Sequence, residues 1–296
     1  NRIRSSAIYA TISGGNNNSI GTNAGYTTIG GGDSNTIGTN AAYATISGGA
    51  QNAISTNADW AAIGGGRLNK IQNDAQASTI SGGRQNTIQT NALYGTISGG
   101  YLNTIRTNAQ ASTVAGGQGN TIGTNANYNA ISGGLNNTNN GDVAVISGGE
   151  YNRIEFDALG STIGGGQTNV IKANAWWATI PGGYGCVVSA AYSFAAGRRA
   201  VADHAGCFVW ADSKDFDFGP ANDNQFYVRA TGGVRITSAI DAGTGATTAG
   251  VRLLPGECTW DCISDRNAKT NFASVNVRDV LARVAAMPVS RNFLES

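Results

Sequence analysis

The sequence has little charge, a single histidine and no long apolar segment, and each shortage excludes a class of function. Only 12% of its 296 residues are charged, and 19 basic against 18 acidic residues leave a net charge of +1. This balance gives no general attraction to nucleic acid or to an anionic membrane, so we expect neither as a partner. The apolar runs all fall short of the roughly 18 residues that a membrane-spanning helix needs, which predicts no membrane span.

Residues that could bind a metal are also scarce. His204 is the only histidine, and the four cysteines are Cys186, Cys207, Cys258 and Cys262. The last two are compatible with a disulfide, half of a zinc site or two thiols, but zinc would need further ligands. We favour free buried thiols or one local disulfide, and we expect no metal and no cofactor.

A 17-residue repeat dominates the chain as far as Ile180. Its first apolar position is filled by Ile12, Ile29, Ile46, Ile63, Ile80, Ile97, Val114, Ile131, Ile146, Ile163 and Ile180. Its second is filled by Ile20, Ile37, Ile54, Ile71, Ile88, Ile105, Ile122, Ile154, Ile171 and Val188. Successive members of the first series are one full period apart, except that Ile131 and Ile146 stand two positions closer together. A fixed period of this length indicates one structural unit stacked many times.

Each repeat has the composition of two short strands joined by turns. Paired glycines and an asparagine separate the two apolar positions, and both residue types accept positive φ. A helix is excluded because Gly-Gly interrupts every unit and β-branched residues fill the apolar positions. The repeat therefore predicts one coil of a parallel β-solenoid, with strands of about four residues. Asn35, Asn52, Asn69, Asn86, Asn103 and Asn120 recur at one position, which predicts a ladder of paired side-chain amides.

These patterns give an all-β fold class and three regions. Residues 1–200 are expected to form the parallel β-solenoid (β-roll) rod of 17-residue coils, with residues 192–197 as a last degenerate coil that caps it. Residues 201–263 contain alternating strand patterns at 226–230 and 233–236, which predict a β-rich neck. Residues 264–296 contain one amphipathic helix at about 277–287, because Asn276 is a good N-cap and the apolar positions are 277, 280, 281 and 284.

The core predicted for one coil is thin, because each coil supplies only two large apolar side chains. A semi-regular row of aromatic residues would lie on its surface: Tyr9, Tyr26, Tyr43, Trp60, Tyr94, Tyr128 and Trp177. Such rings favour burial against another copy of the chain. We therefore expect an oligomeric rod, with about three solenoids around a common axis.

Charged residues gather after the repeat. Arg198 and Arg199 are either a solvated edge or a pairing surface for an acidic partner or a neighbouring chain. Four aspartates follow at Asp212, Asp215, Asp217 and Asp223. Aspartates at this spacing could hold calcium, but they lack the EF-hand pattern with its closing glutamate, so solvated turn residues are the simpler interpretation.

The repeated phrase Asn-Ala…Ala-Thr-Ile-Ser-Gly-Gly resembles the head repeats of trimeric autotransporter adhesins and repeats of phage-type tail fibres, over roughly residues 7–200. The resemblance implies a homotrimer of left-handed parallel β-rolls at an extracellular surface or on a phage-like particle. The commoner repeat of that family is shorter than this one, which implies longer turns in this chain.

The segment Ser264-Asp265-Arg266-Asn267-Ala268-Lys269-Thr270-Asn271-Phe272 is similar to the start of the intramolecular chaperone domain of phage tailspikes and endosialidases. The resemblance implies that Ser264 is a nucleophile, that Lys269 is its general base and that the chain cuts itself between Ile263 and Ser264. Serine needs such a base, and lysine serves as one only where burial lowers its pKa. Without the resemblance, Ser264 and Lys269 would be ordinary surface residues.

That chaperone module is several times longer than residues 264–296, and this sequence begins at Asn1 without a methionine or a visible signal peptide. We therefore expect a processed product or a fragment, in which self-cleavage is inactive. The predicted function is a structural trimeric fibre, spike or adhesin shaft of a phage-like tail, an injection device or a cell surface. A surface glycan or a protein would be its receptor.

Two other classes of function have weaker support. An ice- or surface-binding solenoid would use a threonine row, here Thr22, Thr39, Thr56, Thr90, Thr107 and Thr124. A carbohydrate-processing tailspike would need paired carboxylates about 5–10 Å apart. The rod offers Asp33, Asp59, Asp74, Asp142, Glu150, Glu155 and Asp157, without a repeating pair. Trp176 and Trp177 are either stacking platforms for a sugar or packing residues at the cap or trimer interface.

Overall fold

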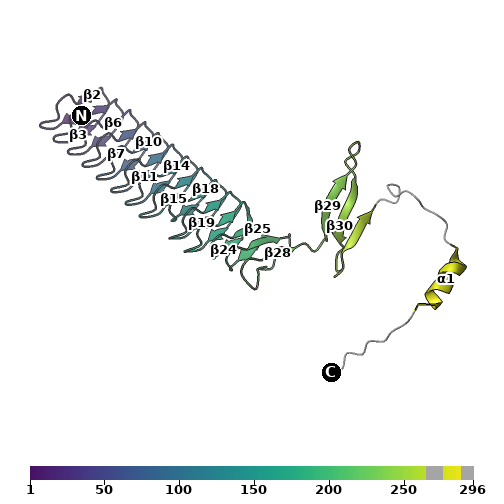
Figure 1. The fold of residues 1–296 in the computed structure, drawn as a ribbon. Coiled ribbons are helices and arrows are strands. Elements are labelled where there is room, and N and C mark those ends of the chain that lie inside the picture. The colour runs from purple at the N-terminus through teal and green to yellow at the C-terminus, as the bar shows by residue number, and fades with distance from the viewer. Residues whose placement is uncertain (265–275, 288–296) are drawn as a thin grey trace. The chain divides into compact units, whose positions relative to one another are not determined.

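The structure is a computed structural model that describes residues 1–264 and 276–287. It divides into two compact units, residues 1–229 and residues 230–296, which are considered separately below. Its described elements are strands apart from one short helix, and the first unit is a parallel β-solenoid (Figure 1). The fold class predicted from the repeat is thereby confirmed.

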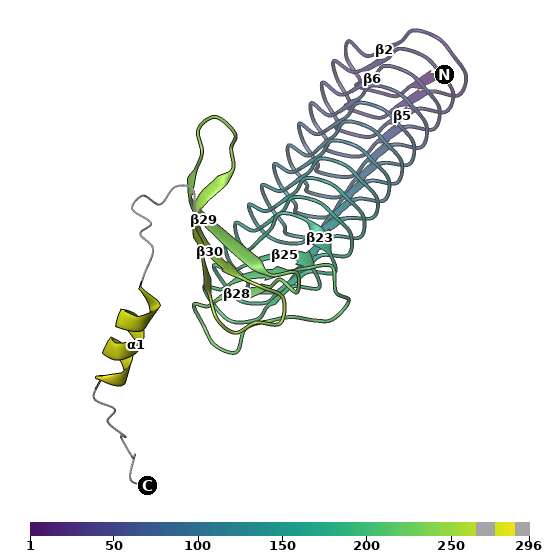
Figure 2. The ribbon, with the colours of Figure 1, turned by 90° about the vertical axis from the view of Figure 1, so that its right-hand side faces the viewer.

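The first unit is a rod in which successive coils lie one behind another (Figure 2). One sheet contains β1 (Arg2–Ile3), β3 (Ser19–Ile20), β5 (Thr36–Ile37), β7 (Ala53–Ile54), β9 (Lys70–Ile71), β11 (Thr87–Ile88), β13 (Thr104–Ile105), β15 (Thr121–Ile122), β17 (Thr138–Asn139), β19 (Arg153–Ile154), β21 (Val170–Ile171), β24 (Val187–Val188) and β26 (Val201–Ala202). The other contains β2 (Thr11–Ile12), β4 (Thr28–Ile29), β6 (Thr45–Ile46), β8 (Ala62–Ile63), β10 (Thr79–Ile80), β12 (Thr96–Ile97), β14 (Thr113–Val114), β16 (Ala130–Ile131), β18 (Val145–Ile146), β20 (Thr162–Ile163), β22 (Thr179–Ile180), β25 (Phe194–Arg198), β27 (Phe208–Ala211) and β28 (Phe226–Arg229), with β23 (Gly183–Tyr184) paired to β25.

Strand register follows the sequence period. Ile80 pairs with Ile63 on one side and Ile97 on the other, one repeat away in each direction. A third column of single-residue bridges, such as Arg67 to Arg84, joins the same coils. The repeated strands contain two residues, not the four predicted, because left-handed backbone soon follows each one. In a single coil Ala77, Gln85 and Asn91 all have φ between 52 and 58°.

Two columns of isoleucine fill the interior of the rod. Ile46, Ile63 and Ile80 have no exposed surface, and neither have Ile71 and Ile88 in the other column. Small buried residues, mostly alanine, occupy the remaining inward positions. The residue before each isoleucine in a strand points the other way, as β-strand alternation requires. The stacked isoleucines therefore form a continuous core, as the repeat predicts.

A buried asparagine in each coil fastens that coil to the next. Nδ2 of Asn86 donates to the carbonyls of Gly82 and Gly100 at 3.0 Å, while its Oδ1 accepts the backbone N–H of Asn103 at 3.0 Å. The equivalent contacts repeat from Asn18 to Asn169. The ladder predicted from the sequence exists, but its amides bond mainly to backbone. Its role is to satisfy buried polar groups at the glycine corner.

In the coil that is two residues short, between Ile131 and Ile146, a buried asparagine closes the turn. Asn139 takes an isoleucine position between Ile122 and Ile154 and is fully buried. Its side chain accepts from the N–H of Gly141 and donates to the carbonyl of Ala144, at 3.2 and 2.9 Å. The amide therefore closes the tight turn left by the two missing residues, without an unpaired buried group.

The rod continues past residue 200, where the repeat alone placed its end. Strands β25, β27 and β28 remain parallel, and the rings of Phe194, Phe208 and Phe226 stack with centroids 4.6 and 4.9 Å apart. Residues 192–197 are consequently an interior coil and not the cap. Phenylalanine replaces the residue before isoleucine in these coils, so the sequence phrase is lost although the stacking persists.

The second unit contains a three-stranded antiparallel sheet and the helix. Strand β30 (Thr247–Leu253) lies between β29 (Val234–Ile240) and β31 (Asp261–Ser264). Helix α1 spans Val277–Ala285, and its N-cap Asn276 accepts the N–H of Arg278, as predicted. The patterns at 226–230 and 233–236, both expected in the neck, therefore belong to different units.

We predict that Ile88→Ala lowers the free energy of unfolding by about 2–5 kcal/mol, because it opens a cavity in a fully buried column. Urea denaturation followed by circular dichroism measures the loss. Thr87→Ala, one residue earlier on the outward side of the same strand, is the matched control and should cost well under half as much. Equal losses of unfolding free energy in the two variants would contradict the placement of Ile88 in a buried column.

We predict that Asn86→Ala costs about 3 kcal/mol, because it removes the side-chain partner of the Gly82 carbonyl and of the Asn103 N–H. It also removes one of two hydrogen bonds to the carbonyl of Gly100, which keeps the backbone N–H of Arg84. Asn73→Ala is the control, since Asn73 is exposed and its side chain accepts one long contact from Thr56, at 3.3 Å. Urea denaturation compares the two variants. A milder effect for Asn86 than for Asn73 would show that the ladder is dispensable.

Candidate functional site

Ser264, the nucleophile implied by the chaperone resemblance, is the last residue of β31. Its backbone pairs with Ala249 of β30, and Ile263 pairs with Gly250. The Ile263–Ser264 bond therefore lies in an edge strand of the three-stranded sheet. Lys269 falls among residues 265–275, outside the described part of the chain. The structure thus places one member of the implied pair, and the pairing stays a prediction.

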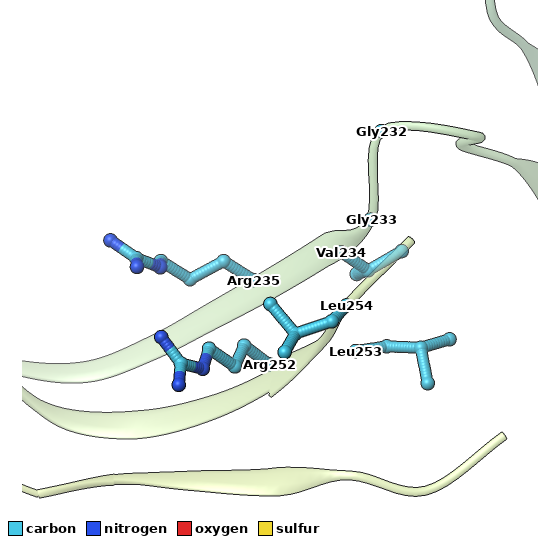
Figure 3. A pocket seen from close by; sticks show the side chains of 7 residues that line it. All are labelled: Gly232, Gly233, Val234, Arg235, Arg252, Leu253 and Leu254. Carbon is cyan, nitrogen blue, oxygen red and sulfur yellow. The ribbon is translucent and has the colours of Figure 1, made fainter. Parts of the chain in front are cut away.

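The three-stranded sheet has two chemically different faces. Its register puts Val234, Ile236, Val251 and Leu253 on one face, which we call the apolar sheet face. Arg235 and Arg252 pair across the strands on the other face, and Asp261 pairs with Arg252 from the third strand. Figure 3 shows the two arginine side chains alongside each other, extending away from Leu253. Nε of Arg252 is 3.7 Å from Oδ2 of Asp261, so one of the two cations has a carboxylate beside it.

The apolar sheet face is partly exposed to solvent, since Val234, Val251 and Leu253 are half-buried and Ile236 is exposed. Ile236 is 56% exposed, and none of the residues described within 230–263 and 276–287 is buried. On helix α1 the predicted apolar positions, Val277, Val280, Leu281 and Val284, are exposed by 44–77%. A small sheet gains stability by covering an apolar face. The described part of this unit therefore has apolar surface for association but no interior of its own.

Ion pairs near the end of the rod account for the charged residues singled out in the sequence. Arg198 pairs with Asp215 at 2.9 Å, and Nε of Arg199 donates to Asp217 at 2.7 Å. That hydrogen bond lowers the pKa of the Asp217 carboxyl and raises the pKa of Arg199. The arginines therefore meet carboxylates of their own chain, in place of the acidic partner considered above.

Arg229 and Asp212 form a more protected pair, which no sequence pattern identifies. Their side chains are each 14% exposed, and Nε of Arg229 lies 2.9 Å from Oδ1 of Asp212. The guanidinium also donates to the carbonyls of Lys214 and Phe216 at 2.8 Å, and it lies over the ring of Phe218. Arg229 thus holds the 212–218 loop against the last coils.

The residues considered as metal ligands have other partners or remain separate. Asp223 accepts the N–H of Ala205, and the ring of His204 contacts Asp203. All four cysteines are free: Cys186 and Cys207 are buried, whereas Cys258 and Cys262 are exposed. Among the described residues, no group of three or more His, Cys, Asp or Glu side chains is placed to hold a metal ion.

Cys186 continues the asparagine ladder with a different side chain. Its N–H donates to Oδ1 of Asn169, and its Sγ lies 3.3 Å from the carbonyl of Gly197. Burial raises the pKa of this thiol, which keeps it protonated. A neutral donor here satisfies a corner carbonyl, as the asparagine amide does in earlier coils. This role is structural.

Several carboxylates of the rod are engaged in local contacts, most of them from coil to coil. Asp59 and Asp142 accept backbone N–H groups, while Glu155 contacts Arg153 and Lys172. The threonine row proposed for a surface-binding solenoid lies in the turns and not on a strand face, for example at Thr90 and Thr107. These contacts describe architecture, and they give no support to either rival function.

One corner of the rod carries exposed aromatic rings. We call this set the aromatic spine: Tyr9, Tyr26, Tyr43, Trp60, Tyr94, Tyr128, Trp177 and Tyr192, which are 49–73% exposed. The first four form a continuous stack with centroids 4.9, 5.0 and 5.6 Å apart. Trp176, the other candidate sugar platform, is 46% exposed beside Trp177. The spine is thus a row of exposed aromatic rings along one corner of the described coils, interrupted where Ala77 and Ala111 take the same position.

Comparison with known proteins adds no assignment: no family model and no curated protein sequence matches the chain. In the described residues, none of the helical structure is both long and apolar enough to cross a bilayer.

We predict that Arg229→Met destabilises the end of the rod by about 3 kcal/mol, because it removes the cation paired with the poorly exposed carboxylate of Asp212 and the hydrogen bonds to the carbonyls of Lys214 and Phe216. Arg198→Met is the control: its pair with Asp215 is largely solvated, and the change should cost about 1 kcal/mol at most. Hydrogen exchange of the backbone amides in β27 and β28 measures both. Equal protection in the two variants would show that Arg229 does not anchor the 212–218 loop.

Proposed function

We propose that this protein is the shaft of a trimeric fibre, spike or adhesin on a phage-like particle or a cell surface, and that its work is structural. The observation that carries the proposal is the uninterrupted rod. Its isoleucine and asparagine columns run from coil to coil, and several of its carboxylates make contacts between coils. Stacking of this kind builds length and stiffness, which a shaft requires.

Assembly into a trimer is supported by the second unit. In a single chain the apolar side of helix α1 is exposed, and the apolar sheet face is partly exposed. Other copies of the chain can cover these surfaces, and cyclic symmetry would bring three equivalent sheets together around one axis. The resemblance of the repeat to trimeric adhesin heads and tail fibres supports the same number of chains.

The receptor and the self-cleavage follow from the same resemblance. A shaft of this class presents a surface glycan- or protein-binding region to its target. After the trimer has folded, the hydroxyl of Ser264 attacks the carbonyl carbon of Ile263 and gives its proton to Lys269. The Ile263–Ser264 amide bond breaks as the amino group of Ser264 takes up a proton, and water then hydrolyses the resulting ester, which leaves two separate chains. An edge strand suits this cut, because one side of β31 is free of strand partners within the described sheet.

Light scattering coupled to size-exclusion chromatography tests the assembly directly. We expect three chain masses for residues 1–296, and elongated particles by electron microscopy. Ile236→Glu places a charge on the apolar sheet face and should shift the protein towards monomer. Thr237→Glu, the adjacent residue on the opposite face, should leave the mass unchanged. A wild-type monomer at micromolar concentration would contradict the proposal.

A further inference from the structure

The aromatic spine occupies a backbone conformation that does not favour aromatic residues. Tyr26, Tyr43 and Trp60 have φ of 58, 57 and 56°, in the left-handed region that costs most side chains free energy. At another left-handed corner the same coils use Asn40 and Asn57, which tolerate it well. Tyrosine and tryptophan are therefore not what the fold itself requires at the spine.

The rings also contribute little to the interior of the chain. They project from a corner and remain at least 49% exposed, whereas the isoleucine columns are closed. A strained backbone position that repeatedly holds a large exposed apolar side chain is better explained by a surface contact than by folding. The chemistry of the aromatic spine indicates which kind of partner makes that contact.

The arrangement of the rings argues against a stacked sugar along the first coils. A sugar ring stacks on an open aromatic face, but Tyr26 and Tyr43 each have a neighbouring ring against both faces. What the column presents outwards is a row of ring edges. The residue preceding a spine residue is never Lys or Arg. The one carboxylate at that position, Asp59 before Trp60, accepts the backbone N–H of Ala42. The surface is apolar and nearly uncharged.

We infer that the aromatic spine is the surface through which parallel copies of this chain contact one another along the rod. The inference rests on the proposed trimer and specifies which corner of each solenoid faces the axis. A backbone hydrogen bond from each spine residue after Tyr9 to the preceding coil, such as Tyr43 to Gly25, keeps the rings in line. A second copy of the chain carries aromatic rings at the same spacing, so each ring of one copy can contact the equivalent ring of the other. A partner with another period would lose register after a few coils.

The available area suits a stable interface. The eight rings expose about half to three-quarters of their surface. With an aromatic side chain of about 150–250 Å², the spine offers roughly 700–1,200 Å² per chain. A standard protein interface buries about 800 Å² per partner. The spine alone therefore approaches the area required, before the second unit contributes.

The test is a triple variant of the full chain, Tyr26→Asn, Tyr43→Asn and Trp60→Asn. Asparagine is favoured at left-handed positions, so the solenoid should keep its circular dichroism spectrum and melting temperature. We expect the concentration at half-assembly, measured by sedimentation velocity, to rise at least tenfold. The matched control is Leu68→Asn, Leu102→Asn and Tyr151→Asn, which alters three left-handed residues at another corner. This control should assemble like the wild type.

The possible results separate the two proposals. A folded spine variant that assembles as well as the wild type would overturn the spine contact and leave the trimeric shaft intact. A monomeric wild-type protein would overturn both. If the spine variant assembles normally but loses binding on a glycan array that the wild type recognises, the spine is a sugar site and our inference fails. If the control variant also dissociates, the effect is not specific to the spine, and the inference fails as well.

Discussion

The structure depends on the contact that the buried asparagine of each coil makes with the backbone of its neighbours. Asn86 satisfies two glycine carbonyls with one amide and receives the N–H of Asn103 in return. Without these bonds, the left-handed corner next to the core would bury unpaired backbone groups, which is costly. The asparagine ladder thus pairs the backbone groups at this sharp corner, so that the interior can exclude water. The isoleucine columns supply the apolar surface that is buried beside it.

The need to pair buried backbone groups between coils also explains the coils in which the sequence departs from the repeat. In the shortened coil Asn137 keeps the ladder position, while Asn139 takes an isoleucine site and closes the turn. At the end of the repeat, Cys186 replaces the ladder asparagine with a thiol donor. Further on, stacked phenylalanines and the Arg229–Asp212 pair maintain the coils that no longer carry the repeated phrase. Each change keeps the coil-to-coil bonding while the sequence varies.

Much of this could be read from the sequence, because a strict period forces equivalent residues into columns. Ile46, Ile63 and Ile80 had to share one column, and Asn276 had to begin a helix. The end of the rod could not be found in this way, since Phe208 and Phe226 stack without the repeated phrase. Arg229 was missed for a similar reason: a lone arginine carries no pattern until the fold brings it to Asp212. The implied Ser264–Lys269 pair depends on geometry beyond the described residues.

Hydrogen exchange along the asparagine ladder tests the central claim most directly. The backbone N–H groups of Asn35, Asn52, Asn69, Asn86, Asn103 and Asn120 each donate to the asparagine one coil earlier. They should therefore be among the slowest amides in the chain to exchange, with similar protection from coil to coil. Exchange of these amides as fast as that of the exposed residues 241–246 would contradict an interior held together by this ladder.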